Sequence, residues 1–356
     1  MTGSLSARDD FRLNNFDLLR LMAATEVLIF HAKAHLGLAF PAWADSLWHF
    51  RGVPVFFVIS GFLISASYER SSGIGSYFRN RALRIFPGLW ACISITVLVA
   101  SLFGFSFLHP AGLAWYVAQL GALIYTPGFL KDFGFGSYNG SLWTIPVEIQ
   151  FYFVLPVLYW LARRSKISLD AVLLAAFVLF SLVGICINHL FPDMLTSEET
   201  RVAKLLKYAF FTHFYMFLAG TLLQRHIAVV HRFLRGKGVL WLAAYIAVVN
   251  LKPAGAIGDY LSLMMLAIAV VSLAYTLPSL SSRLLRGNDI SYGVYIYHGL
   301  VLNILVSLNW TGSAISLLAT VGGATLAAWL SWVLIEKPSL RLKRQSLRAT
   351  EAALPA

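Results

Sequence analysis

Long apolar runs, separated by short polar segments, recur along the whole chain. Each run has close to the twenty residues or so that a helix needs to cross a bilayer, and none shows the period-two alternation of a membrane β-strand. Only helices and closed barrels satisfy the backbone in lipid, so we predict an all-α integral membrane protein with about ten transmembrane helices. The predicted spans are residues 16–37, 50–67, 86–107, 143–162, 168–190, 206–223, 238–252, 259–277, 290–308 and 314–335.

One further apolar stretch, residues 110–127, is bounded by prolines and interrupted by Gly112 and Gly121. It predicts a short, partly inserted helix on the outer side rather than another span. For the chain as a whole we expect a cytoplasmic tail at 1–13, a single transmembrane domain at 14–341 and a second cytoplasmic tail at 342–356.

Composition agrees with this class, and charge orients the chain. Hydrophobic residues make up 58% of the 356 positions, charged residues only 12%, and the mean hydropathy is +0.72. Most of the 28 Lys and Arg residues lie in alternate loops, which by the positive-inside rule predicts that both termini are cytoplasmic. The net charge of +12 is then explained by contact with anionic membrane lipids and requires no nucleic acid.

Ionisable residues in the first predicted span are the clearest functional signal, because each is costly in lipid unless it is paired or hydrated. At 100° per residue, His31 and His35 lie on the same helix face as Arg20, and Asp17 lies on that face too. Arg20 and His31 are about 16 Å apart along the axis. In a structural interpretation, Asp17 and Arg20 are an i,i+3 pair and His31 is a hydrogen-bonded core histidine. In a functional interpretation, the stripe belongs to a reaction centre.

An arginine cluster precedes the third predicted span, in the segment SSGIGSYFRNRALRIFP. Arg81 and Arg84 share a helix face at i,i+3 spacing, and Arg79 is close in sequence. Anchoring of a helix end by positive charge is the simpler interpretation. The functional alternative is an anion clamp, because guanidinium groups bind phosphate oxygens bidentately.

The segment GSYNGSLWTIPVEIQFYFVLP places a glutamate about five residues into a span. Ser141 and Tyr152 are seven residues before and four residues after Glu148, which predicts that all three share one helix face. Pro146 is expected to free backbone carbonyls within this helix. A glutamate at this depth must be paired, protonated or in contact with water.

Two late spans add further polar residues. In ISYGVYIYHG, Tyr295 and His298 are at i,i+3 spacing. Glu336 ends the last span beside Lys337, which is an ordinary arrangement at a membrane boundary.

These motifs together resemble membrane acyltransferase family 3. The resemblance rests on Arg20 with His31 eleven residues later, and on VPVFFVISGFLI, RALRIFP, SLWTIPVEIQFY, ISYGVYIYHG and EKP, in the expected order from about residue 14 to 341. It implies transfer of an acyl group, most often acetyl, from cytoplasmic acyl-CoA. The implied acceptor is a hydroxyl of a cell-surface glycan or lipid-linked sugar, and the implied location is a bacterial inner membrane.

The residues and the resemblance together suggest roles for individual side chains. His31 would be a general base or a covalent acyl relay. Arg20 would line the entry or stabilise the thioester oxygen, and Glu148 would hydrate or orient the catalytic centre. The phosphates of acyl-CoA would bind Arg79, Arg81 and Arg84. The substrate-binding residues would be Ser141, Trp143, Tyr152, His298 and Glu336. No metal ion is expected.

One position departs from the family pattern. Many members have an aspartate where this chain has Pro54, so another group must orient the histidine if orientation is needed. Glu26, Asp45 and Glu148 are the candidates.

Two other functions fit a polytopic protein with buried charges. A proton-coupled transporter of a small anionic or sugar substrate also uses ionisable residues in broken spans. However, the chain shows no repeated halves, and a proton relay does not require a phosphate-binding arginine cluster. A non-catalytic membrane scaffold would tolerate replacement of His31. No recognisable motif specifies the acceptor, the acyl chain length or the oligomeric state.

Overall fold

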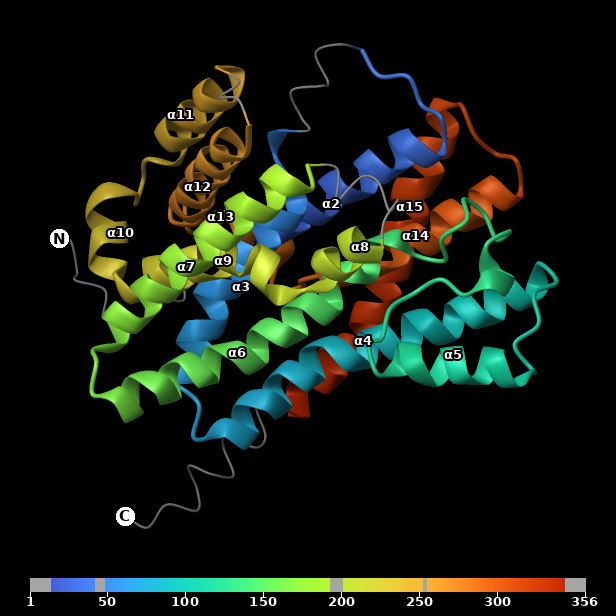
Figure 1. The fold of residues 1–356 in the computed structure, drawn as a ribbon. Helices are drawn as coiled ribbons and strands as arrows, with labels where there is room; N and C mark the ends of the chain where they lie inside the picture. Colours follow the sequence, from blue (N-terminus) through green and yellow to red (C-terminus); the bar gives the residue numbers. More distant parts are fainter. Residues whose placement is uncertain (1–13, 42–48, 193–200, 252–254, 343–356) are drawn as a thin grey trace. The chain divides into compact units, whose positions relative to one another are not determined.

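Helices joined by loops make up the computed structural model over the residues that it describes, 14–41, 49–192, 201–251 and 255–342 (Figure 1). The elements are α2 (Phe16–His35), α3 (Gly52–Glu69), α4 (Ile74–Leu102), α5 (Pro110–Leu120), η2 (Gly128–Leu130), η3 (Gly140–Trp143), α6 (Thr144–Ser165), α7 (Leu169–Leu190), α8 (Arg201–Tyr208), α9 (Phe210–Arg225), α10 (Ile227–Phe233), α11 (Gly238–Asn250), α12 (Gly255–Ala274), α13 (Leu280–Leu285), α14 (Ser291–Ser307), α15 (Ala314–Ser331) and the π-helix η4 (Trp332–Glu336). Each of the ten predicted runs coincides with a helix, and the stretch 110–127 contains the short helix α5.

Six helices of the described chain are long and apolar enough to cross a membrane: α3, α4, α6 with η3, α7, α12, and α15 with its extension. The pair α10 and α11, bent by 88°, would make a seventh. Of the other predicted spans, α9 and α14 have 16 and 17 residues, and α2 carries four charged side chains. The class of multi-pass, all-α membrane protein is confirmed. The count of ten spans and the cytoplasmic termini stay predictions, and both predicted tails lie outside the described residues apart from Leu342.

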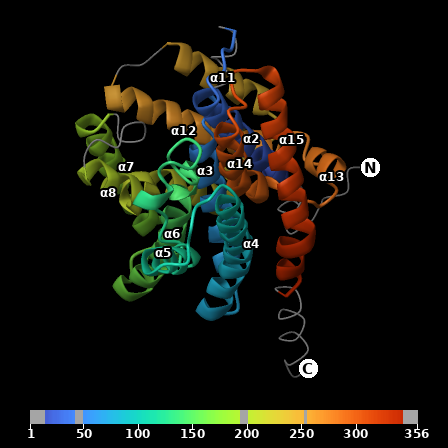
Figure 2. The ribbon, with the colours of Figure 1, turned by 90° about the vertical axis from the view of Figure 1, so that its right-hand side faces the viewer.

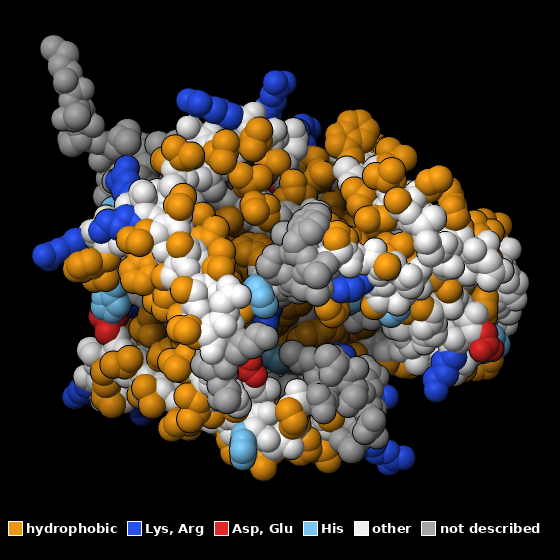
Figure 3. Space-filling view, turned by 90° about the horizontal axis from the view of Figure 1, so that it is seen from above, with side chains coloured by type: hydrophobic (Ala, Val, Ile, Leu, Met, Phe, Trp, Pro, Cys, Tyr) orange, Lys and Arg blue, Asp and Glu red, His pale blue; other side chains and the backbone are white. Residues whose placement is uncertain are grey.

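The surface carries the hydrophobic side chains that contact with lipid requires. Leu98, Leu102 and Leu318 are exposed by 62%, 80% and 69% of their area. Figure 3 shows hydrophobic side chains over much of the face that it presents. A soluble monomer rarely exposes apolar patches of this extent.

The described residues fall into two compact units. The first comprises those within Met1–Ala23, Ser46–Arg70 and Val147–Asn288, and the second those within Ala24–Asp45, Ser71–Pro146 and Asp289–Ala356. Helix α2 begins in the first unit and ends in the second.

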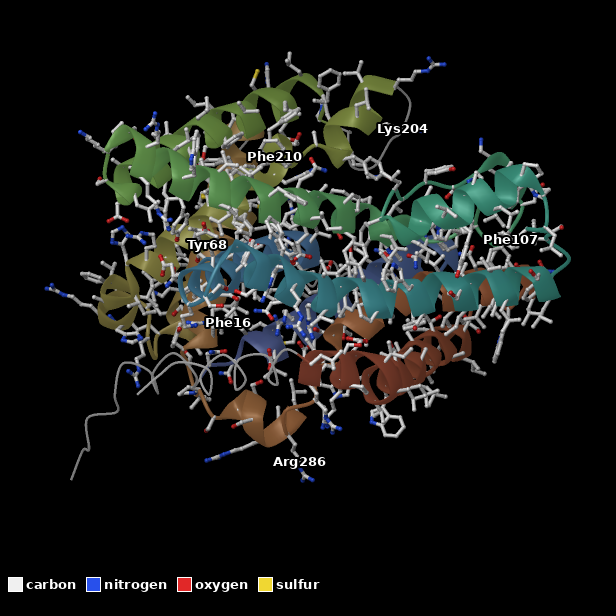
Figure 4. All side chains as sticks on the ribbon, turned by 90° about the horizontal axis from the view of Figure 1, so that it is seen from below. Phe16, Tyr68, Phe107, Lys204, Phe210 and Arg286 are labelled. Carbon is white, nitrogen blue, oxygen red and sulfur yellow. The ribbon has the colours of Figure 1, made fainter. Side chains whose placement is uncertain are left out.

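In the first unit, α3 packs closely against α9. A Cβ atom on Gly61 would lie 1.8 Å from the carbonyl oxygen of Phe217, and one on Gly220 would lie 2.0 Å from that of Val58. Small residues at such crossings let helix backbones approach, which is a main source of packing energy in lipid. Phe16, labelled in Figure 4, opens α2 in this unit.

We expect Gly61→Ala and Gly220→Ala each to destabilise the protein by about 1–3 kcal/mol, because the added methyl group must push two backbones apart. The measurement is the unfolding temperature in detergent. Gly75→Ala is the matched control, since Gly75 is also helical and a Cβ atom added there would have nothing within 4 Å. Unfolding temperatures of Gly61→Ala and Gly220→Ala equal to that of Gly75→Ala would contradict the packing argument.

In the second unit, α14 lies beside α15 (Figure 2) and also contacts α4. Helix α4 begins at Ile74, earlier than predicted, because no proline interrupts the arginine-rich segment before Pro87. Tyr77 and Asn80 are buried on this early part of the helix. The arginine cluster therefore belongs to the same helix as the third span rather than to a loop before it.

Two predictions about the start of α6 are wrong. Pro146 lies in the first turn after Thr144, where the missing N–H has no helical acceptor to lose, and the proline in the helix interior is Pro156. Ser141 belongs to the separate 3₁₀ helix η3, so it does not share a face of α6 with Glu148.

Candidate functional site

A pair of histidines joins α2 to α14 in the second unit. The Nδ1 atom of His31 lies 2.9 Å from Nε2 of His298, and the two rings lie edge to edge with centroids 5.2 Å and planes 20° apart. His298 is fully buried, whereas His31 is partly exposed. Both were predicted site residues, but their direct contact was not predicted.

The hydrogen bonds of this pair indicate which ring nitrogen of each histidine carries a hydrogen. Nδ1 of His298 lies 3.2 Å from the carbonyl oxygen of Val294, which can only accept, so this nitrogen carries a hydrogen. In the neutral form, which a fully buried imidazole favours, Nε2 of His298 is then an acceptor. His31 therefore donates from Nδ1, and its own Nε2 is left with a lone pair. This is the protonation state that a general base or a nucleophile needs.

An arginine–aspartate pair lies at the start of the same α14. Arg84 of α4 donates to the Asp289 carboxylate at 2.5 Å, and Asp289 is 8% exposed. The other oxygen of this carboxylate accepts from the backbone and the hydroxyl of Ser291, at 3.2 and 2.5 Å. The guanidinium group of Arg84 is thus held in one orientation by a buried carboxylate.

The other two arginines of the cluster differ in their surroundings. Arg81 shares a helix face with Arg84 and is half-buried. Arg79 is exposed and lies about 140° or more around α4 from both of them. The predicted cluster therefore has two arginines on one face and a third on another.

Helix α14 sets the spacing between the arginine pair and the histidine pair. The Tyr292 hydroxyl links α14 to α4 by donating a hydrogen bond to the Ile85 carbonyl at 2.9 Å. His298 lies seven residues after the first residue of α14, which is about 10 Å along the axis. One rigid helix thus carries the partners of both Arg84 and His31.

The predicted residues Arg20, Glu148 and Tyr152 belong to the first unit. Arg20 forms an ion pair with Asp17, as the structural interpretation of the first span expected. Glu148 accepts hydrogen bonds from Ser60 at 2.6 Å and from Tyr152 at 2.7 Å. These contacts join α3 to α6 and give the carboxylate two partners.

The residues of η3 contact the face of α14 in the second unit. Ser141 is buried and donates to the Asn139 side chain at 2.7 Å. Asn139 in turn donates to the Ile296 carbonyl at 2.6 Å. Tyr295 donates to the Ser141 carbonyl at 2.6 Å, and Trp143 is half-buried. Ser141 thus takes part in the packing of α14, whereas the sequence suggested a place beside Glu148.

Glu336 is more unusual than its position beside Lys337 suggested. It is 2% exposed and ends the π-helix η4, a geometry often found at functional sites. One carboxylate oxygen accepts from Ser331 at 3.0 Å, and the other is buried with no hydrogen-bond partner among the described residues. A buried carboxylate oxygen of this kind is expected to bind a proton, a water molecule or a polar ligand.

Of the candidates to replace the aspartate absent at Pro54, Glu26 lies on α2 itself, about 140° around the helix from His31. Glu148 contacts Ser60 and Tyr152 in the first unit, and Asp45 lies outside the described residues. His31 is hydrogen-bonded to an imidazole, that of His298. Among the described residues, no group of three or more His, Cys, Asp or Glu side chains could hold a metal ion.

Comparison with known proteins decides the family. A family model described as "Acyltransferase domain" matches residues 13–336. Nodulation protein 10 of Rhizobium leguminosarum bv. viciae is 34% identical, over 93% of this chain and 94% of the relative. The chain belongs to membrane acyltransferase family 3. The resemblance drawn from the motifs is confirmed.

Other relatives of this family 3 acyltransferase carry more specific names. The "O-acetyl transferase" of Shigella phage Sf6 is 29% identical, over 91% of this chain and 95% of the relative. The "Putative peptidoglycan O-acetyltransferase YrhL" of Bacillus subtilis (strain 168) is 23% identical, over 90% of this chain and 54% of the relative. No solved structure matches the chain. The protein is therefore a multi-pass membrane acyltransferase.

Proposed function

We propose that this acyltransferase moves an acetyl group from cytoplasmic acetyl-CoA to a hydroxyl of a cell-surface glycan or lipid-linked sugar in a bacterial inner membrane. The observation that carries the proposal is the hydrogen bond from His31 to His298, because it leaves Nε2 of His31 able to take a proton or an acyl group. The names of the phage and Bacillus relatives support the acetyl group, and the latter supports a glycan acceptor.

Two routes use the same nitrogen atom. As a general base, His31 removes the proton from the acceptor hydroxyl, whose oxygen then bonds to the thioester carbonyl carbon while the C–S bond breaks. The departing thiolate takes the proton back from His31. As a covalent relay, Nε2 itself first bonds to the acyl carbon as the C–S bond breaks and the thiolate leaves. The acceptor hydroxyl then displaces the imidazole, and its proton goes to the thiolate. In both routes His31 becomes positively charged, and its Nδ1–H bond to His298 stabilises that charge.

We assign donor binding to Arg81 and Arg84, with Arg79 at the periphery. Their guanidinium groups suit the phosphates of coenzyme A. The Asp289 carboxylate holds the guanidinium group of Arg84 in place. The pantetheine arm would then extend along α14 from this pair toward His298 and His31. Glu336, with one unpartnered buried oxygen, is positioned to bind a polar group of a substrate. For Arg20, Glu148, Tyr152, Ser141 and Trp143, the catalytic and substrate-binding roles stay predictions.

The test is turnover of acetyl-CoA labelled in its acetyl group by the purified protein in nanodiscs. We expect release of labelled acetate in the absence of an acceptor and labelled ester when a glycan fraction is added. Mass spectrometry of the acid-quenched protein separates the routes, because only the relay places the label on His31. If the wild-type protein neither binds nor turns over acetyl-CoA, the proposed function is wrong and transport becomes the better interpretation.

Arg81→Ala should raise the KM for acetyl-CoA roughly tenfold or more with a smaller effect on kcat, because a charged hydrogen bond to the donor is lost. Arg84→Ala alone would be ambiguous, since it removes the positive charge beside the buried Asp289 carboxylate and destabilises the fold. The double variant Arg84→Ala/Asp289→Asn avoids that charge and should show the same rise in KM. The control is Arg283→Ala, at an exposed arginine of α13. A donor KM unchanged in both variants would exclude this donor site.

A further inference from the structure

The loop at residues 133–138 carries an aromatic ring onto the helix that bears His31. The rings of Phe135 and His35 stack with centroids 3.8 Å apart and planes 13° apart. His35 follows His31 by one helical turn, with ring centroids 5.8 Å apart. His31 is hydrogen-bonded to His298 in turn, so contacts between neighbouring rings run from His298 to Phe135.

Asn303 of α14 fastens this loop, which we call the strap. Its side-chain oxygen accepts from the N–H of Phe135 at 3.1 Å. Its side-chain nitrogen donates to the carbonyls of Ser137 and Tyr138 at 3.0 and 2.9 Å. Three polar backbone groups of the strap are therefore bonded to the same helix that carries His298.

The strap approaches α14 most closely at Gly134. Its φ is +59°, and a Cβ atom there would lie 2.1 Å from Oδ1 and 2.6 Å from Cα of Asn303. The Gly134 N–H donates to the Ser307 hydroxyl at 3.1 Å. Only glycine meets both the backbone conformation and the available space.

Apolar side chains cover the same end of α2. Ala32, Leu36, Leu302 and Leu305 form a buried cluster, and Phe135 packs against it. This row of rings thus ends in hydrocarbon contacts on the side of His35.

A transferase must keep water away from its activated acyl group, because a base that activates an acceptor hydroxyl also activates water. We propose that the strap is the wall that excludes water from His31 on the side of His35, and that Asn303 is its positioning residue. The inference rests on the proposed function. With the wall in place, the acceptor oxygen bonds to the acyl carbon as the C–S bond breaks. With the wall displaced, a water oxygen bonds there instead, which yields free carboxylic acid and thiol.

Gly134→Ala and Phe135→Ala displace the wall without altering either histidine of the pair. We expect the release of labelled acetate from acetyl-CoA without an acceptor to rise on the order of three- to tenfold, because water now reaches the base. A second measurement does not depend on turnover. Modification of His35 by diethylpyrocarbonate, quantified by mass spectrometry, should become faster once its ring is uncovered.

Two further variants complete the design. Phe135→Tyr keeps the stacked ring and should match the wild type in both measurements. Gly128→Ala, in the nearby 3₁₀ helix η2, is the control for an added methyl group, because a Cβ atom at this position would have nothing within 4 Å. Gel filtration checks the fold of each variant.

The outcomes separate this inference from the proposed function. Faster hydrolysis and faster His35 modification in Phe135→Ala, with Phe135→Tyr unchanged, support the wall. If hydrolysis in Phe135→Ala equals that in Gly128→Ala, the wall is wrong, whatever happens to His35. If the wild-type protein does not turn over acetyl-CoA at all, the proposed function fails first.

Discussion

Replacing His31 by alanine or glutamine is expected to reduce acyl transfer by about 100- to 10,000-fold, the usual contribution of a positioned general base. A covalent relay would lose at least as much, because no other group would carry the acyl chain. Acetate release without an acceptor should fall together with transfer, since both begin at Nε2 of His31. The donor KM should change little, because the proposed phosphate contacts are made by Arg81 and Arg84.

The matched control is His189→Gln, at an exposed histidine near the end of α7. It removes an imidazole from a helix end that takes no part in the proposed site and should leave transfer unchanged. Transfer by His31→Gln at the rate of His189→Gln would remove His31 from the mechanism. The ionisable face of α2 would then be better explained as a transport path.

Much of this architecture could be predicted because each membrane helix can be identified from its own sequence. An apolar run of sufficient length predicts a helix without knowledge of its neighbours, and the ten runs coincide with helices. The same local geometry placed Arg20 and His31 on one helix face and predicted the Asp17–Arg20 pair.

Contacts between distant elements could not be obtained this way. His31 and His298 are 267 positions apart, and the i,i+3 spacing of Tyr295 and His298 says nothing about what α14 faces. Asp289 immediately precedes the motif ISYGVYIYHG, and an acidic residue two positions before Ser291 at a helix start was a signal available in the sequence.

The strap illustrates a second limit. Phe133 to Tyr138 has no periodicity that would set it apart from other loops, and only its glycines mark it as a turn. Asn303, which fastens it, is a single polar residue in an apolar helix, and its partners are backbone atoms. Backbone acceptors carry no sequence signature, so such a contact becomes visible only in three dimensions.

The second large effect on activity is expected at His298. Its variants test whether this residue positions His31 for the reaction or only supports the fold. His298→Leu removes the acceptor for the Nδ1–H of His31, so either tautomer of His31 becomes possible and the hydrogen bond that orients its ring is lost. We expect kcat to fall on the order of 10- to 100-fold, by analogy with the loss of a group that orients a metal-binding histidine. The donor KM should stay near the wild-type value, and the protein should remain folded by gel filtration.

His298→Gln is the informative partner of this variant. The side-chain carbonyl of glutamine can reach about as far as Nε2 of histidine and can accept the same hydrogen from His31. It should therefore recover much of the lost kcat, whereas His298→Asn, whose shorter side chain places its carbonyl nearer the position of Nδ1, should not. If leucine, asparagine and glutamine all reduce kcat equally, the imidazole of His298 does more than orient His31, and a direct role in proton transfer follows. If none of them reduces kcat, the pair only packs α2 against α14, and the protonation state of His31 must be set by another group.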